Sequence, residues 1–257
     1  MADANILPFR KTLQEAGEQI GFMKGFFRNI FRLDFEWNEF VRQCYMIGYK
    51  SFPLVGITGF IVGFVMTLQS EPTMKEFGAE SYIPRMVAIS LIREICPVII
   101  ALICAGKISS GIGAELGSMK VTEQIDAMDV SGANPVQYLV VTRILACICM
   151  VPLLTLMADA LGLAGSYAGV NLASDVSAVL FFHKAFSSVE FGDLLPAIIK
   201  TFFFGFAIGF VGCYKGYNSD RGTESVGVAA NSAVVNASLW IIVIDGIAVQ
   251  LTNALGY

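Results

Sequence analysis

The sequence has few charged residues for its length. Of its 257 residues only 15% are charged, whereas 55% are hydrophobic, and the mean hydropathy is +0.66. Soluble globular domains average about 25% charged residues, so this composition excludes a water-soluble enzyme and a disordered linker. The 17 basic residues are outnumbered by 21 acidic ones, which leaves no basic field to bind nucleic acid. The composition indicates an integral membrane protein.

Motifs that carry chemistry are also missing. The chain has no Gly-x-x-x-x-Gly-Lys-Ser/Thr phosphate loop, so we expect it to bind neither ATP nor Mg²⁺. The one histidine, His183, is assigned to the side of the membrane opposite the serine-containing stretch 106–113, which disfavours a serine hydrolase. The six cysteines include no CxxC pair, and we interpret them as buried hydrophobic residues. We therefore expect no catalytic residue, cofactor site or metal site in this chain.

Long hydrophobic runs, in contrast, are abundant. A hydrocarbon core about 30 Å thick requires about 20 mostly apolar residues in a helix. Five stretches meet this requirement, at residues 51–68, 86–105, 144–169, 194–214 and 235–255. The sequence predicts an all-α integral membrane protein in which residues 1–257 form a single domain with five transmembrane helices.

The first residues predict an amphipathic helix over 8–32 rather than a signal peptide. Apolar residues recur there at spacings of four and three, and charged residues lie off this stripe. Such a helix ahead of a span is expected to lie in the membrane interface; the alternative is a soluble helix packed on a partner. Gly17, Gly21 and Gly25 fall on every fourth residue, which would permit close approach by another helix.

Lysine and arginine are distributed unevenly between the two sides of the predicted membrane domain. With the N-terminus inside, twelve of them lie in the inner segments and four lie on the outer side. Inner loops of membrane proteins carry an excess of these residues. The distribution predicts a cytoplasmic N-terminus and, after five spans, a C-terminus on the outer side.

Five charged residues interrupt the apolar runs, namely Arg93, Glu94, Asp159, Lys200 and Asp245. At about 1.5 Å per helical residue, all five fall in one layer of the outer half of the membrane. Ionisable groups at such depth pair with one another or line a polar path. We expect Asp159, Lys200 and Asp245 to form a buried charge network, with Lys200 and Asp245 as a pair. Arg93 and Glu94 are adjacent and cannot share a helix face, so at least one of them should face a cavity or a subunit seam.

The inner loop between the second and third predicted spans also has helical character. Residues 115–130 read as a short helix that is amphipathic through Met119, Val121, Ile125 and Met128 and ends at a Ser-Gly-Ala-Asn-Pro turn. A helix that faces the cytosol between two spans suits docking to a cytosolic partner. The alternative is a solvated loop helix.

Two runs of sequence carry a family resemblance. The first is Ser90-Leu-Ile-Arg-Glu-Ile-Cys-Pro-Val, continued by Ala105-Gly-Lys. The second is Ala114-Glu-Leu-Gly-Ser-Met-Lys-Val-Thr-Glu-Gln-Ile-Asp-Ala-Met, followed by Asn134-Pro-Val and Arg143. In these runs the chain resembles the MlaE/YrbE family, the permeases of phospholipid-trafficking ABC transporters. Weaker similarity covers nearly the whole chain, while Cys96 and Lys107 stand where that family has glycine and arginine.

The resemblance implies an assembly in a bacterial inner membrane. Its expected parts are two copies of this permease, a cytosolic ABC ATPase that binds the ATP and Mg²⁺, a periplasmic ring of MCE-domain proteins and a STAS-domain accessory protein. The C-terminus would be periplasmic. The substrate would be a glycerophospholipid that moves between the inner and outer membranes.

The resemblance also assigns roles to residues. The segment 115–130, which we name the coupling segment, would bind the ATPase through Glu115, Met119, Glu123, Gln124 and Met128. The lipid path would lie at the dimer seam. Its expected lining residues are Val65, Leu68, Gln69, Arg93 and Glu94.

Two other functions compete with this interpretation. An ion-coupled secondary transporter could use Glu94, Asp159 and Asp245, and it would not need the coupling segment. A membrane-embedded enzyme that modifies lipid head groups would need a cluster of carboxylates and histidine at one interface, and the sequence shows no such cluster.

Overall fold

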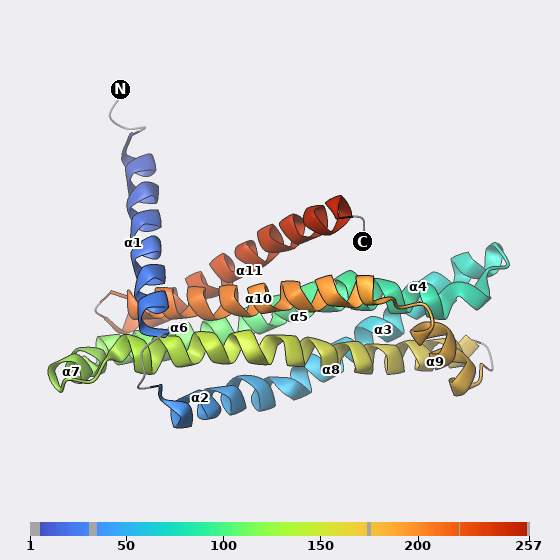
Figure 1. The fold of residues 1–257 in the computed structure, drawn as a ribbon, viewed down its shortest axis with the longest axis horizontal. Helices are drawn as coiled ribbons and strands as arrows, with labels where there is room; N and C mark the ends of the chain where they lie inside the picture. The colour runs from blue at the N-terminus through green and yellow to red at the C-terminus, as the bar shows by residue number, and fades with distance from the viewer. Residues whose placement is uncertain (1–5, 31–34, 174–175, 221, 256–257) are drawn as a thin grey trace.

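The computed structural model describes residues 6–30, 35–173, 176–220 and 222–255, and every regular element in these ranges is helical. Five helical segments are long and apolar enough to cross a membrane: Trp37–Glu76, Glu80–Val121, Val136–Leu172, Phe191–Tyr217 and Thr223–Ala254. They extend along the long axis of the molecule (Figure 1). The predicted all-α class with five membrane-spanning helices is therefore confirmed.

Most spans are built from more than one helical element. The first comprises α2 (Trp37–Cys44), the π-helical turn η1 (Tyr45–Tyr49) and α3 (Lys50–Glu76). The second comprises η2 (Glu80–Tyr82), α4 (Ile83–Ser90), η3 (Leu91–Ile95), α5 (Cys96–Cys104), η4 (Ala105–Ser109) and α6 (Ser110–Val121). The others are η5 (Val136–Val141) with α8 (Thr142–Ala173), then α10 (Phe191–Tyr217) and α11 (Thr223–Ala254), while α9 (Ala178–Phe186) precedes α10.

The helices are longer than the apolar runs from which they were predicted. Each predicted run lies inside one span, except for residue 255 at the end of the last run. Hydropathy detects only the part of a helix that suits hydrocarbon. Polar residues such as Lys50 and Glu76 continue α3 beyond that part.

Helix α1 (Ile6–Ile30) crosses the bundle instead of running along it (Figure 1). Phe22 packs against Phe210 and Tyr214 at centroid distances of 5.7 and 5.6 Å. The predicted helix over 8–32 corresponds to this element, although residues 31 and 32 lie outside the described residues. A Cβ built on Gly17, Gly21 or Gly25 meets no atom within 4 Å, so no helix of the described chain approaches this glycine row.

Helices α3 and α8 approach each other closely because glycines line their contact. A Cβ on Gly63 would overlap the carbonyl of Gly162, and one on Gly165 would overlap a carbonyl of α3. Beside them the hydroxyls of Thr67 and Ser166 share a hydrogen bond of 2.7 Å. In lipid, where apolar side chains gain little by leaving the solvent, such packing and hydrogen bonding hold helices together.

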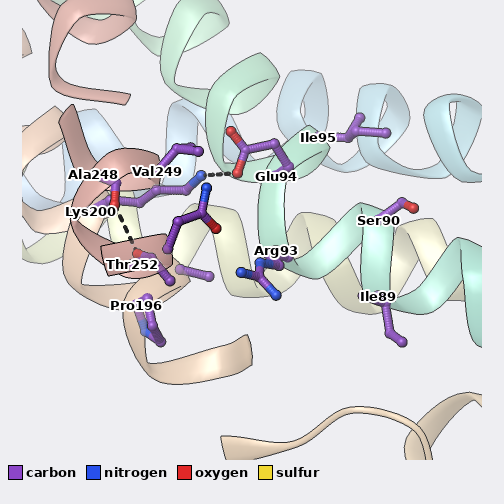
Figure 2. A pocket seen from close by; sticks show the side chains of 12 residues that line it. Ile89, Ser90, Arg93, Glu94, Ile95, Pro196, Lys200, Ala248, Val249 and Thr252 are labelled. Carbon is purple, nitrogen blue, oxygen red and sulfur yellow. Dashed lines mark hydrogen bonds and ion pairs between the residues drawn. The ribbon is translucent and has the colours of Figure 1, made fainter. Parts of the chain in front are cut away.

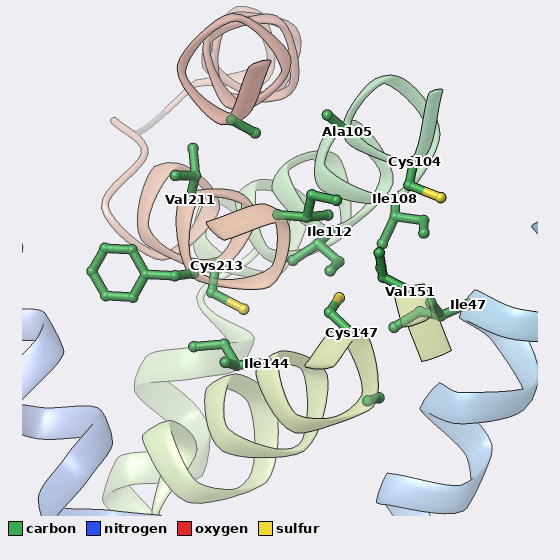
Figure 3. Close-up of a cluster of buried hydrophobic side chains, with 14 of the residues drawn as sticks. Ile47, Cys104, Ala105, Ile108, Ile112, Ile144, Cys147, Val151, Val211 and Cys213 are labelled. Carbon is green, nitrogen blue, oxygen red and sulfur yellow. The ribbon is translucent and has the colours of Figure 1, made fainter. Parts of the chain in front are cut away.

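The main hydrophobic cluster lies where α5, α6, α8 and α10 meet (Figure 3). Cys104, Cys147 and Cys213 are buried in it among isoleucine and valine side chains. All six cysteines are free thiols. The expectation of buried cysteines is confirmed for these three and for Cys96, but it is wrong for Cys149, which is exposed on α8.

The coupling segment is not one helix, contrary to the prediction. Its first part ends α6 at Val121, and its second part is a separate helix, α7 (Gln124–Val130). Glu123 between them has a φ of 58°, in the left-handed region, which breaks a right-handed helix. This reversal lets Ile125 pack into the main cluster, where it is 2% exposed. The predicted end at the turn after Val130 is confirmed by Gly132, whose φ is 82°.

Candidate functional site

A cavity of about 550 Å³ opens between the second, fourth and fifth spans. Arg93 and Glu94 of η3 line it together with Lys200 of α10 (Figure 2). Most of the remaining lining is apolar and comes from α4, η3, α10 and α11. The cavity therefore combines a small group of charges with hydrocarbon walls, an arrangement that suits an amphiphilic ligand.

Lys200 is the central charge of this group. Its Nζ lies 2.6 Å from Oε2 of Glu94 and 3.0 Å from Oδ1 of Asp245. The Lys200 side chain is only 5% exposed, whereas those of Glu94 and Asp245 are 41% and 17% exposed. The predicted pair of Lys200 with Asp245 is confirmed, and Glu94 is a third member that the sequence did not reveal.

Arg93 forms a second ion pair at the rim. Its Nη1 lies 3.1 Å from Oδ1 of Asp193 at the start of α10. Glu94 and Arg93 follow each other in the π-helical turn η3, yet both line the same cavity, with Glu94 reaching toward Lys200 (Figure 2). The expectation that at least one of them faces a cavity is confirmed for both.

The sequence did not identify Asp193 as a site residue, because the predicted fourth apolar run begins one residue later, at position 194. A signal for it was present in the sequence. Glu190 and Asp193 form a capping box at the start of α10, and an acidic residue three positions after a cap is typical of such boxes. The same carboxylate that caps the helix thus also binds Arg93.

An apolar groove of about 600 Å³ runs between α10 and α11 and adjoins the charged cavity. Leucine, isoleucine and phenylalanine side chains of the two helices provide most of its lining. Pro196, Lys200, Ala248 and Thr252 line both the groove and the cavity. The amine of Lys200 therefore lies where a charged space meets an apolar one.

Asp159 does not belong to the Lys200 cluster, contrary to the predicted network. It is 8% exposed, and its Oδ1 has no hydrogen-bond partner. It lines a separate small recess with Pro97, Pro152 and Thr201. The prediction failed because Asp159 lies beside Ala197, Ile198 and Thr201 of α10, whereas Lys200 extends from the same helix toward α11 and η3. Among the described residues, no group of three His, Cys, Asp or Glu side chains could hold a metal ion.

A second groove, of about 430 Å³, lies at the end of the bundle where α6 and α7 meet. Glu115, Met119 and Gln124 line it together with Tyr138 and Arg143. Arg143 is 2% exposed, and its Nη2 lies 2.9 Å from Oε1 of Glu115. This ion pair connects the middle of α6 to the start of α8.

Comparison with known proteins identifies the family of the chain. The sequence profile of the family described as Permease MlaE matches residues 40–251, well over half of the chain. The chain belongs to the MlaE permease family.

Relatives within this family cover most of the chain. A probable ABC transporter permease protein of Rickettsia prowazekii is 38% identical over 211 residues, which are 82% of each chain. One of Rickettsia bellii is 34% identical over 241 residues, covering 94% of this chain and 93% of the relative. The intermembrane phospholipid transport system permease protein MlaE of Haemophilus influenzae is 31% identical over 207 residues, covering 80% and 79%.

The structure of this MlaE-family permease brings together only part of the predicted lipid path. Arg93 and Glu94 line the charged cavity, but Val65, Leu68 and Gln69 do not. Those three side chains are exposed on α3, whose opposite face packs on α8. The fourth span, which was not predicted to line the path, contributes Lys200 instead.

The predicted ATPase-binding residues also lie in three different places. Glu115, Met119 and Gln124 line the groove beside α6 and α7. Glu123 is exposed at the break between these helices, and Met128 packs against the main hydrophobic cluster. In this MlaE-family permease the coupling segment is thus a bent surface anchored on the bundle, not a free loop helix.

Proposed function

We propose that this chain is the membrane-spanning permease subunit of an ABC transporter that moves phospholipids between the inner and outer membranes. The observation that carries the proposal is a charged cavity continuous with an apolar groove inside a five-span bundle. A phospholipid has a charged head and two apolar chains, and these two spaces match its two parts. Family membership supports the same function.

The energy for transport would come from a partner. We propose that a cytosolic ABC ATPase binds the ATP and Mg²⁺ and docks on the coupling segment through Glu115, Met119, Glu123, Gln124 and Met128. The ion pair between Glu115 and the buried Arg143 supports this role. Because it links α6 to α8, a displacement of α6 by the ATPase would be transmitted to α8.

The rest of the assembly follows the resemblance. We propose two copies of this permease in a bacterial inner membrane, a periplasmic ring of MCE-domain proteins and a STAS-domain accessory protein. The N-terminus would be cytoplasmic and the C-terminus periplasmic. The excess of basic residues on the inner side supports this orientation. The transverse position of α1 (Figure 1) supports its place in the membrane interface, because an interfacial helix lies across the spans.

The exposed face of α3 would complete the lipid path at the dimer seam. A photo-crosslinking residue at Val65, Leu68 or Gln69 should then form lipid adducts in the assembled transporter. A crosslinker at Phe202, which is exposed on α10 and lines neither the cavity nor the groove, is the control. Equal adduct yields at Phe202 and on α3 would indicate ordinary bilayer contact and would remove α3 from the path.

Reconstitution tests the function itself. The permease and its ATPase would be placed in proteoliposomes, and transfer of a labelled phospholipid to an acceptor would be followed with and without ATP. We expect transfer to require ATP hydrolysis and to persist when ionophores collapse the ion gradients. Transfer that continues without ATP and stops with the ionophores would favour the ion-coupled secondary transporter instead.

A further inference from the structure

The ion pairs of the cavity contain more carboxylates than cations. Arg93 and Lys200 are bound by three carboxylates, those of Glu94, Asp193 and Asp245. No other Lys or Arg lines the cavity among the described residues. With every group ionised, two cations and three anions leave the cluster with a net charge of −1.

Only two of these five charged groups are accessible to a ligand. Lys200 is 5% exposed and Asp245 is 17% exposed, so both are largely covered. The side chains of Arg93 and Glu94 are 37% and 41% exposed and line the same cavity. A ligand therefore meets one accessible cation and one accessible anion on neighbouring residues.

We propose that this cavity selects phospholipids with a zwitterionic head group over phospholipids with an anionic one. The inference rests on the proposed function and specifies its substrate class. The lipid phosphate contacts the guanidinium of Arg93, which can offer a phosphate two parallel N–H donors. The ammonium group of the head contacts the carboxylate of Glu94.

The net charge of the cluster provides the discrimination. A zwitterionic head adds no net charge. An anionic head makes the net charge of the cluster more negative, from −1 to −2, and the apolar walls make this extra negative charge unfavourable. Specificity of this kind comes from repulsion of the wrong ligand as much as from attraction of the right one. Because Arg93 and Glu94 are partly exposed to solvent screening, we expect a preference of about ten-fold rather than more.

The groove between α10 and α11 can hold the acyl chains of the ligand. It adjoins the charged cavity at Pro196, Lys200, Ala248 and Thr252. A head group bound to Arg93 and Glu94 can therefore place an acyl chain in the groove without leaving the protein. This continuity identifies the ligand as a lipid rather than a free phosphate ester.

A competition between two lipids tests the inference. The full chain in detergent would be incubated with equimolar phosphatidylethanolamine and phosphatidylglycerol that carry the same palmitoyl and oleoyl chains. Retained lipid would be extracted and quantified by mass spectrometry. We expect retention of phosphatidylethanolamine to exceed that of phosphatidylglycerol by about ten-fold.

Glu94→Gln removes the carboxylate that binds the ammonium group. This variant should reduce the preference to within about two-fold, and it should still fold because Lys200 keeps its 3.0 Å contact with Asp245. The matched control is Glu80→Gln, which removes the same charge from an exposed turn outside the cavity. The control should keep the full preference.

The possible results distinguish the head-group preference from the proposed function. Equal retention of both lipids by the unsubstituted chain, or preferred retention of phosphatidylglycerol, would overturn the head-group inference and leave the proposed function standing. An equal loss of preference in Glu94→Gln and Glu80→Gln would also overturn it. Retention of neither lipid above the level of a detergent blank would overturn the proposed function as well.

Discussion

Replacing Lys200 with methionine tests the three-membered cluster directly. Lys200→Met keeps the length of the side chain but removes the cation that lies 2.6 Å from Glu94 and 3.0 Å from Asp245. Loss of one partner from a buried ion pair costs about 3–5 kcal/mol, because the remaining charge is left uncompensated. The side chain of Glu94 is 41% exposed, and water can partly solvate it. We therefore expect a loss of about 3 kcal/mol in the free energy of unfolding, at the low end of that range.

Removing one carboxylate should cost less than removing the cation. In Asp245→Asn the amine of Lys200 keeps its contact with Glu94, so the loss should be about 1.5 kcal/mol, the value of a hydrogen bond to a charged group. The double change Lys200→Met with Asp245→Asn should be less damaging than Lys200→Met alone, because it leaves one buried carboxylate fewer without a partner.

A charge swap distinguishes a cluster of three from a simple pair. Lys200→Asp with Asp245→Lys would restore a two-membered pair, but here the new carboxylate at position 200 lies beside Glu94. We expect little rescue from the swap and a clear recovery when Glu94→Gln is added. Reversible unfolding in mixed detergent micelles, followed by circular dichroism, measures each variant. Full rescue by the swap alone, or equal losses in Lys200→Met and Asp245→Asn, would refute the reasoning.

Three further predictions concern packing and coupling. Gly63→Val should destabilise the chain by roughly 3 kcal/mol in the same unfolding assay because its Cβ overlaps the backbone of α8, whereas Gly246→Val, with no atom within 4 Å of its Cβ, should cost below about 1 kcal/mol. Glu115→Ala should lower phospholipid transfer per ATP hydrolysed by more than about two-fold; an unchanged ratio would show that its contact with Arg143 carries no coupling. Glu123→Lys with Gln124→Ala should lower copurification of the ATPase by about ten-fold while the permease still inserts, and undiminished copurification would contradict the docking site.

The class of the protein and the number of spans could be predicted because hydropathy is a local property. A run such as 144–169 must cross the membrane whatever its neighbours are, since about 20 apolar residues in a helix match the hydrocarbon thickness. The absence of a phosphate loop could also be read directly, because that motif is a short contiguous stretch of sequence. That at least one of Arg93 and Glu94 faces a cavity followed from their adjacency, because two successive residues cannot share one helix face; that both line the same cavity was seen only in the structure.

The break in the coupling segment could not be predicted from periodicity. The spacing of Val121, Ile125 and Met128, four and three residues, fits one face of a single helix. The chain instead reverses at Glu123 so that Ile125 can enter the main cluster. Tertiary packing outweighed the local pattern at this position.

The sequence by itself determined that this chain is a five-span membrane protein with charges inside its apolar runs and no ATP-binding motif of its own. Only the tertiary structure decided that Lys200 contacts Glu94, that Arg93 contacts Asp193 and that Asp159 joins neither. The contacts of Lys200 with Glu94 and Arg93 with Asp193 join residues 106 and 100 positions apart. In a soluble helix the apolar stripe reveals which face is turned inward, but a spanning helix is apolar on every face. Its rotation, and with it the partner of each charge, depends on how the small residues of neighbouring helices fit together.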